Sequence, residues 1–270
     1  MRGTDVLAAS DAAVGFLEPL VSRDWSRAVP GLDFTVASVI AHAACGPLWY
    51  AIDFTGGPGD DGAFEIDVRA DAEPERLLVS LRTTAALCAM TVDGRPPGSR
   101  GFHPAGSADA SGFAAMACDE ILVHTHDAGT GLGESFQPDP RLAGLVLARL
   151  FPWQEPVPDP WAALLHANGR LDLPGRPRRR SWTWHCAPLD EWDGAIPSGL
   201  ARRGGAGPRV RRQSCRRALR PGQQRDPVLR AERCLAERPR RRATVMQGRA
   251  AGRTRHGDVH AAVTRTGVAV

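Results

Sequence analysis

Helical periodicity is the strongest constraint that this sequence places on its fold. Apolar residues recur every three or four positions in four separate segments, each bounded by cap residues or by Gly and Pro. The expected helices run from the cap Thr4 to about Asp24, from the cap Thr35 to about Asp53, from about Pro74 to Val92, and from about Asp109 to a glycine-rich end at 129–133. Four such stripes can be buried against one another, so the sequence predicts an all-α fold with a four-helix bundle as its core.

Two shorter helices are expected after the bundle, at about 140–150 and 159–168. Residues 171–180 are typical of an exposed connection, and 181–189 of an extended strip that packs its tryptophans on the bundle. Trp184, His185 and Cys186 in that strip are open to two interpretations, a second metal or nucleophilic site and a structural role. The structural role is favoured, because no partner residues are identifiable in the sequence.

Glu120 and His124 are four residues apart in the fourth expected helix, and therefore lie on one helical face. Their neighbours on or beside that face are apolar: Phe113, Met116, Ala117 and Ala128. A carboxylate in an apolar stripe is costly unless it is paired or binds a metal. A carboxylate and an imidazole on one face are also two-thirds of a common divalent metal site.

His42 is the candidate third ligand, from the edge of the apolar stripe of the second expected helix. Helix bundles build metal sites in this way, from side chains on facing helices. Taken singly, however, a His on a half-apolar face is more often a packed, hydrogen-bonded histidine, and a Glu–His pair is often a surface pair. Spacing alone leaves both interpretations open.

Residues 25–42 resemble the amino-terminal signature of the mycothiol-dependent maleylpyruvate isomerase family. The second signature of that family is a Glu, a His four residues later and an Asp three further on, which Glu120, His124 and Asp127 match. The resemblance extends to 159–165 and covers roughly the first two-thirds of the chain. The family belongs to the DinB-like superfamily of metal-binding four-helix bundles.

This resemblance implies a DinB-like bundle with a divalent metal, usually zinc, held by His42, Glu120 and His124. Asp127 either orients a metal ligand or a water molecule without binding the metal itself, or is a surface Asp of the last helical turn. His126 departs from the family pattern, which often has an aromatic residue there. An outward-facing side chain is favoured over a fourth ligand, because a residue two positions from His124 lies on a different face of the helix.

Two His and one Glu leave a coordination position of zinc open, and zinc stabilises the thiolate of a small thiol. In the family, this chemistry supports mycothiol-dependent isomerisation or thiol transfer on a small electrophilic substrate. The chain lacks a convincing second folded domain such as full-length isomerases carry, which argues against maleylpyruvate itself. Two alternatives remain: a non-catalytic metal-binding or regulatory module, and a protein that binds polyanions through an arginine-rich tail.

That tail is set apart by charge. Residues 201–270 contain 19 Arg and 4 acidic residues and no Phe, Trp or Tyr, whereas the first 200 residues carry a net negative charge. The sequence thus predicts a helical domain over 1–197 and a poorly ordered tail over 198–270. The tail is interpreted either as a polyanion-binding arm or as an out-of-frame reading of GC-rich DNA. The second is favoured, because aromatic residues that stack on single strands are missing, so nucleic acid is not an expected partner.

The six cysteines include no Cys-x-x-Cys pair, and Cys45, Cys88 and Cys118 are expected to act as small core residues. The chain opens without the continuous apolar run of a secretion signal. No stretch is expected to be long and apolar enough to span a membrane. A reduced cytoplasm is therefore the expected location.

Overall fold

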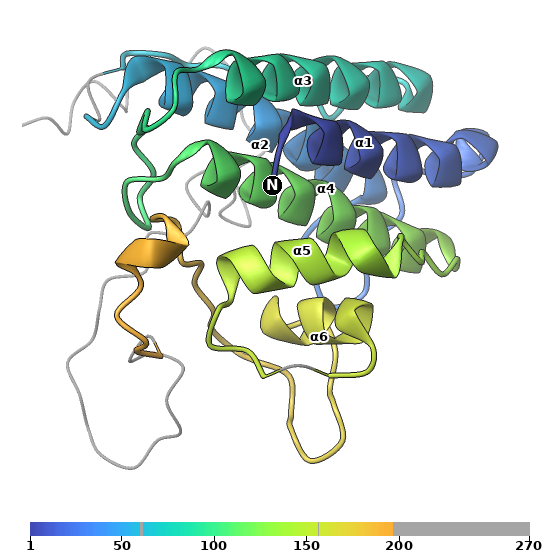
Figure 1. The fold of residues 1–270 in the computed structure, drawn as a ribbon. Helices are drawn as coiled ribbons and strands as arrows, with labels where there is room; N and C mark the ends of the chain where they lie inside the picture. Colours follow the sequence, from blue (N-terminus) through green and yellow to red (C-terminus); the bar gives the residue numbers. More distant parts are fainter. Residues whose placement is uncertain (60–61, 156, 197–270) are drawn as a thin grey trace, which may run out of the picture. The chain divides into compact units, whose positions relative to one another are not determined.

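The computed structural model describes residues 1–59, 62–155 and 157–196 (Figure 1). The described residues form six α-helices and two short 3-10 helices, with no strand among them. The helices are α1 (Gly3–Leu17), α2 (Val36–Gly56), α3 (Pro74–Gly94), α4 (Ala110–Leu132), α5 (Pro140–Leu150) and α6 (Pro160–Ala167); the 3-10 helices are η1 (Glu18–Leu20) and η2 (Leu189–Glu191). The all-α prediction is confirmed.

The first four α-helices form the bundle, in which α1 and α2 each pack against both α3 and α4. Their facing stripes supply one continuous apolar core, in which the largest fully buried side chains include Phe54, Leu81 and Phe113. Helix α5 packs on α4, and α6 packs on α5, as Figure 1 shows. Because α4 lies between the other helices of the bundle and α5, it is buried over most of its circumference, and its polar side chains must find partners inside the protein.

The predicted cap Thr35 is confirmed, and the fourth helix begins next to Asp109, as predicted, with that residue as its cap. The Thr35 hydroxyl accepts a hydrogen bond from the Ser38 amide at 3.2 Å at the start of α2. The Asp109 carboxylate accepts one from the Gly112 amide at 2.7 Å at the start of α4. Helix α4 ends at Leu132 and is followed by Gly133, whose φ of 78° is the left-handed conformation that glycine adopts at low cost.

The first helix differs from its predicted bounds at both ends. Thr4 lies inside α1 rather than capping it, and the Arg2 amide donates instead to the Asp5 carboxylate at 2.9 Å. The α-helix also ends at Leu17 instead of about Asp24, and a 3-10 turn follows. Pro19 lies in that turn, and because proline has no amide hydrogen it interrupts the α-helical ladder.

The strip after α6 is anchored to the bundle, as predicted for its tryptophans, although only one of the two is buried. Trp184 is 7% exposed, whereas Trp182 is 36% exposed. Arg149 of α5 anchors the strip, since its guanidinium donates hydrogen bonds to the carbonyl oxygens of His185 and Cys186 and to the carboxylate of Asp109. A buried arginine with all of these acceptors fixes the path of the strip across α4 and α5.

Helix α3 corrects the expectation about membrane-spanning segments. By length and composition it would be able to cross a membrane, with a mean hydropathy of 1.2 over 18 residues, of which 44% are buried in the bundle. The core helix of a soluble protein meets the same criterion, so this is weak evidence for a membrane. The predicted boundary near residue 197 and the predicted tail over 198–270 lie outside the described residues.

Candidate metal centre

Helices α2 and α4 bring the three predicted ligands together. Glu120 and His124 lie one turn apart on α4, on the face that packs against α2, and His42 lies on the facing side of α2. One potential ligand atom from each residue lies within 4.8 Å of the other two. Gly46 is one turn after His42 and has no side chain, which allows Glu120 to lie close to α2: a Cβ there would be 3.4 Å from Glu120 Cγ.

The three side chains face a common point. Glu120 Oε2 is 3.0 Å from His124 Nε2 and 3.4 Å from His42 Nε2. The two imidazole rings stand edge to face, with their centroids 4.9 Å apart. The Glu120 side chain is 7% exposed and that of His42 is 26% exposed, so the centre is buried on the α4 side and accessible to solvent beside His42.

The electrostatics of the group follow from this close approach. Burial favours the neutral acid of Glu120, but the contacts with His124 and His42 outweigh it and hold the pKa of Glu120 well below its usual range. Burial likewise disfavours a charged His124, yet the contacts with Asp127 and Glu120 raise the pKa of His124 to about 9. This arrangement therefore favours positive charge next to the Glu120 carboxylate.

The residues fit a divalent cation. Glu120 Oε2 is a buried oxygen without a hydrogen-bond partner of suitable geometry, although two imidazole nitrogens lie close to it. Such an orphaned buried carboxylate oxygen is costly. One carboxylate oxygen and two imidazole nitrogens are a donor set that suits zinc and neighbouring divalent metals, and a cation between them would satisfy all three.

Asp127, for which the sequence left an orienting residue and a surface residue open, lies beside His124 and is buried. Its Oδ2 atom is 3.0 Å from His124 Nδ1, so the carboxylate accepts a hydrogen bond from that N–H group, and Nε2 is left to face Glu120. Burial raises the pKa of Asp127, but hydrogen bonds from His124 and Arg170 dominate and lower it to about 2. His126 points away from the three candidate ligands, but it does not face outward as predicted: its half-buried ring packs against Trp161 of α6, with a centroid distance of 5.9 Å.

Two residues beside the group were not predicted from the sequence. The Tyr50 hydroxyl donates to Glu120 Oε1 at 3.2 Å, and Arg170 donates to both oxygens of Asp127. Tyr50 lies two helical turns after His42 on α2, so its position on the same face was a usable signal. Arg170 is 43 residues from Asp127 in sequence, and only the tertiary fold brings the two together.

Cys186 of the strip has a partner that the sequence did not identify. Its sulfur is 3.4 Å from His103 Nδ1 and 3.5 Å from the sulfur of Met116. Burial raises the pKa of the Cys186 thiol to about 12 and lowers the pKa of His103 to about 4. A neutral thiol beside a neutral imidazole is a packed pair rather than a reactive thiolate, in agreement with the structural role favoured for this strip.

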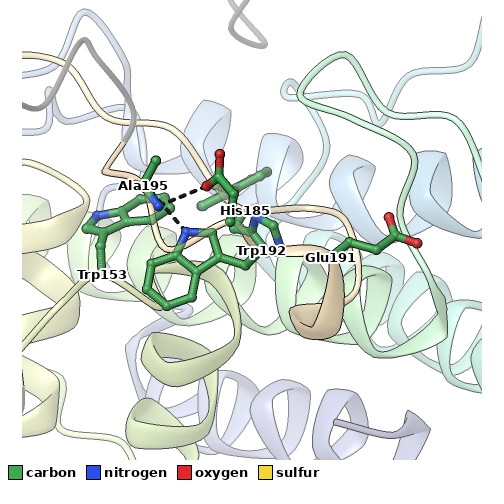
Figure 2. A pocket seen from close by; sticks show the side chains of 7 residues that line it. Trp153, His185, Glu191, Trp192 and Ala195 are labelled. Carbon is green, nitrogen blue, oxygen red and sulfur yellow. Dashed lines mark hydrogen bonds between the residues drawn. The ribbon is translucent and has the colours of Figure 1, made fainter.

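A surface pocket of about 340 Å³ lies beside the strip (Figure 2). Figure 2 shows the indole of Trp192 held by a hydrogen bond to the Ala195 carbonyl, next to Trp153. The other residues that line the pocket are Trp184, His185, Glu191 and Asp193. None of the three candidate metal ligands lines this pocket, so it is separate from the centre between α2 and α4.

Comparison with known families agrees with this architecture. Residues 6–129 match the family described as mycothiol maleylpyruvate isomerase N-terminal domain, and this range contains His42, Glu120, His124 and Asp127. Neither the curated proteins nor the solved structures contained a match to the chain. The helical bundle is that expected of the DinB-like superfamily. The match over residues 6–129 confirms the resemblance to the mycothiol maleylpyruvate isomerase family that the sequence indicated for this part of the chain.

Proposed function

We propose that the protein is a divalent-metal-dependent enzyme that uses a small thiol, mycothiol, for isomerisation or thiol transfer on a small electrophilic substrate. The observation that carries the proposal is the convergence of His42, Glu120 and His124 on a buried Glu120 oxygen that has no hydrogen-bond partner of suitable geometry. The family match over residues 6–129 supports the choice of mycothiol as the thiol.

In this proposal, the two imidazoles and the Glu120 carboxylate hold the cation, with zinc as the first candidate. A divalent cation here would lower the pKa of a small thiol, so that the thiolate is present at neutral pH. Tyr50 holds the second oxygen of Glu120, which leaves Oε2 directed at the two imidazoles. The partly exposed side of His42 is where thiol and substrate would enter.

The reaction class follows from the nucleophile. A thiolate adds to an activated carbon–carbon double bond, rotation follows, and elimination of the same thiol leaves the isomerised product. In thiol transfer, the thiolate instead displaces a leaving group and remains in the product. In this proposal the thiol comes from solution, because burial raises the pKa of all four cysteine thiols among the described residues, with those of Cys88 and Cys186 at about 12.

Metal analysis of the purified full-length chain tests the first half of the proposal. We expect about one equivalent of Zn²⁺ bound per chain, and its loss in His42→Ala and His124→Ala. The matched control is His126→Ala, which removes an imidazole from the same helix that packs on Trp161 and leaves the three ligands intact. Zn²⁺ retained by both ligand variants, or lost equally in the control, would refute the assignment.

Turnover of the Zn²⁺-loaded chain tests the second half. Mycothiol is supplied with a cis-configured unsaturated diacid, such as maleylpyruvate, and in a second assay with an alkyl halide. Isomerisation or thiol consumption that depends on both mycothiol and Zn²⁺ supports the proposal. A chain that binds Zn²⁺ but turns over neither substrate would instead be the non-catalytic metal-binding module.

A further inference from the structure

The segment after α6 makes two buried contacts with α4 through neighbouring residues. Asn168 donates from its amide nitrogen to Asp119 Oδ1 at 2.8 Å, and Arg170 donates to Asp127. Asp119 and Asp127 are eight residues apart, about two helical turns, and therefore lie along one side of α4. Gly169 joins the two contacts with a φ of 70°, a conformation that residues with side chains rarely adopt.

Arg170 is held rigidly in this arrangement. Its amide donates to the Leu165 carbonyl at 2.8 Å, and one guanidinium nitrogen donates to the Asn168 carbonyl at 2.8 Å. The remaining guanidinium nitrogens reach Asp127, with Nη2 2.9 Å from Oδ2 and Nε 3.2 Å from Oδ1. Because the planar guanidinium contacts both oxygens, it fixes the plane of the Asp127 carboxylate as well as its position.

The orientation of Asp127 decides how His124 is presented. Asp127 Oδ2 accepts from His124 Nδ1 at 3.0 Å, so Nδ1 carries a proton. His124 Nε2 is then the nitrogen that faces Glu120 Oε2 and His42. A carboxylate that was free to rotate would allow the imidazole to turn or to change tautomer, and a partner of this kind commonly alters metal affinity by 10- to 100-fold.

We propose that Arg170 is a positioning residue for the metal centre, and that residues outside the family-matched range 6–129 therefore complete the site. The inference rests on the proposed function, since it assumes that His124 binds a metal. Arg170 acts through Asp127 and touches none of the three ligands. Its role opposes the simple electrostatic expectation, because removing a positive charge near a cation site would by itself strengthen cation binding.

Zn²⁺ affinity, measured by competition with a chromophoric chelator, distinguishes these two roles. We expect Arg170→Met to weaken Zn²⁺ binding by about 10- to 100-fold, and Arg170→Lys to weaken it by less, since Lys supplies the charge without contacting both oxygens. The matched control is Arg176→Met, which removes an arginine paired at 2.9 Å with the exposed Glu155. Unchanged or tighter Zn²⁺ binding in folded Arg170→Met would overturn the inference.

A second measurement covers the case in which Arg170→Met fails to fold, because that variant leaves Asp127 buried without its cation. Imidazole ¹⁵N chemical shifts of His124 in metal-free Arg170→Lys report where the ring proton resides. We expect loss of the strong Nδ1–H signature together with weaker Zn²⁺ binding; wild-type values of both would refute the positioning role. If the wild-type chain binds no Zn²⁺, the proposed function fails with it, whereas a wild-type chain that binds Zn²⁺ isolates the Arg170 inference.

Discussion

Asp119 and Glu120 are consecutive in α4, but their side chains bond to different parts of the protein. Glu120 contacts His42 and Tyr50 of α2, whereas Asp119 accepts hydrogen bonds from Asn168 at 2.8 Å and from Trp184 at 3.1 Å. Adjacent residues on a helix point about 100° apart, so one helix supplies the metal centre on one side and the anchor of the C-terminal segment on the other.

Asp119→Ala should therefore lower stability without removing the metal. The substitution removes the acceptor of two buried donors, the side-chain amide of Asn168 and the indole N–H of Trp184. Their loss should lower the free energy of unfolding by about 2–3 kcal/mol. Urea denaturation measures that loss, and Zn²⁺ titration should still find the wild-type stoichiometry. Loss of Zn²⁺ from a folded Asp119→Ala chain would show that metal binding requires the Asp119 contacts as well as the contact between Arg170 and Asp127.

Zn²⁺ should stabilise the wild-type chain and leave His42→Ala unaffected. A ligand that binds only the folded state at 100 times its dissociation constant adds about 2.7 kcal/mol. For a domain of this size, that corresponds to a rise in Tm of roughly 5–10 °C. Thermal denaturation with Zn²⁺ and with chelator measures the shift; an equal shift in His42→Ala would show binding elsewhere on the chain. Metal-free His42→Ala should still fold, because the apolar stripes of the bundle supply most of its stability.

His103 should make the protein less stable in mild acid. Burial outweighs the opposing effect of Glu120 and lowers the pKa of His103 from 6.5 to about 4. As the pH falls below 6.5, His103 is protonated in the unfolded chain but stays neutral in the folded chain. The contribution of His103 to stability is therefore complete above pH 6.5 and is lost progressively toward pH 4. The full loss is on the order of 3 kcal/mol.

His103→Asn isolates this contribution from that of other groups that titrate in acid. The asparagine oxygen can accept the Ala105 amide hydrogen, which is donated to His103 Nδ1 at 3.1 Å in the wild-type protein. Urea midpoints from pH 7 to pH 4.5 should fall less steeply in this variant. Parallel curves for the two proteins would show that His103 takes up its proton as readily in the folded state as in the unfolded state, which would contradict the prediction.

Two glycines should respond oppositely to alanine. A Cβ on Gly101 would lie 2.6 Å from the Phe54 backbone, so Gly101→Ala forces a main-chain shift and should cost about 1–3 kcal/mol. A Cβ on Gly15, an exposed position inside α1, meets no atom within 4 Å. Gly15→Ala should therefore stabilise the protein by about 0.5–1 kcal/mol. Denaturant unfolding of both variants checks the signs; a stabilised Gly101→Ala would contradict the packing described for that turn.

Local sequence patterns determined the helices and most of the candidate ligands. Apolar spacing located α2 and α4, and the cap Thr35 marked the start of α2, because periodicity and capping act within a few residues. Glu120 and His124 share a face by helix geometry alone. The same local reasoning misjudged α1, where Thr4 was an equally plausible cap and where Pro19 limits the helix.

The partners of these ligands were decided by tertiary structure. Which face of α2 meets α4 depends on packing of the whole bundle, so the 3.4 Å approach of His42 to Glu120 did not follow from either helix alone. Arg170 and Asp127 meet because α5 and α6 return the chain to α4 and Gly169 turns it inward. Contacts between residues this distant in sequence depend on the sum of many packing energies, and no local pattern encodes that sum.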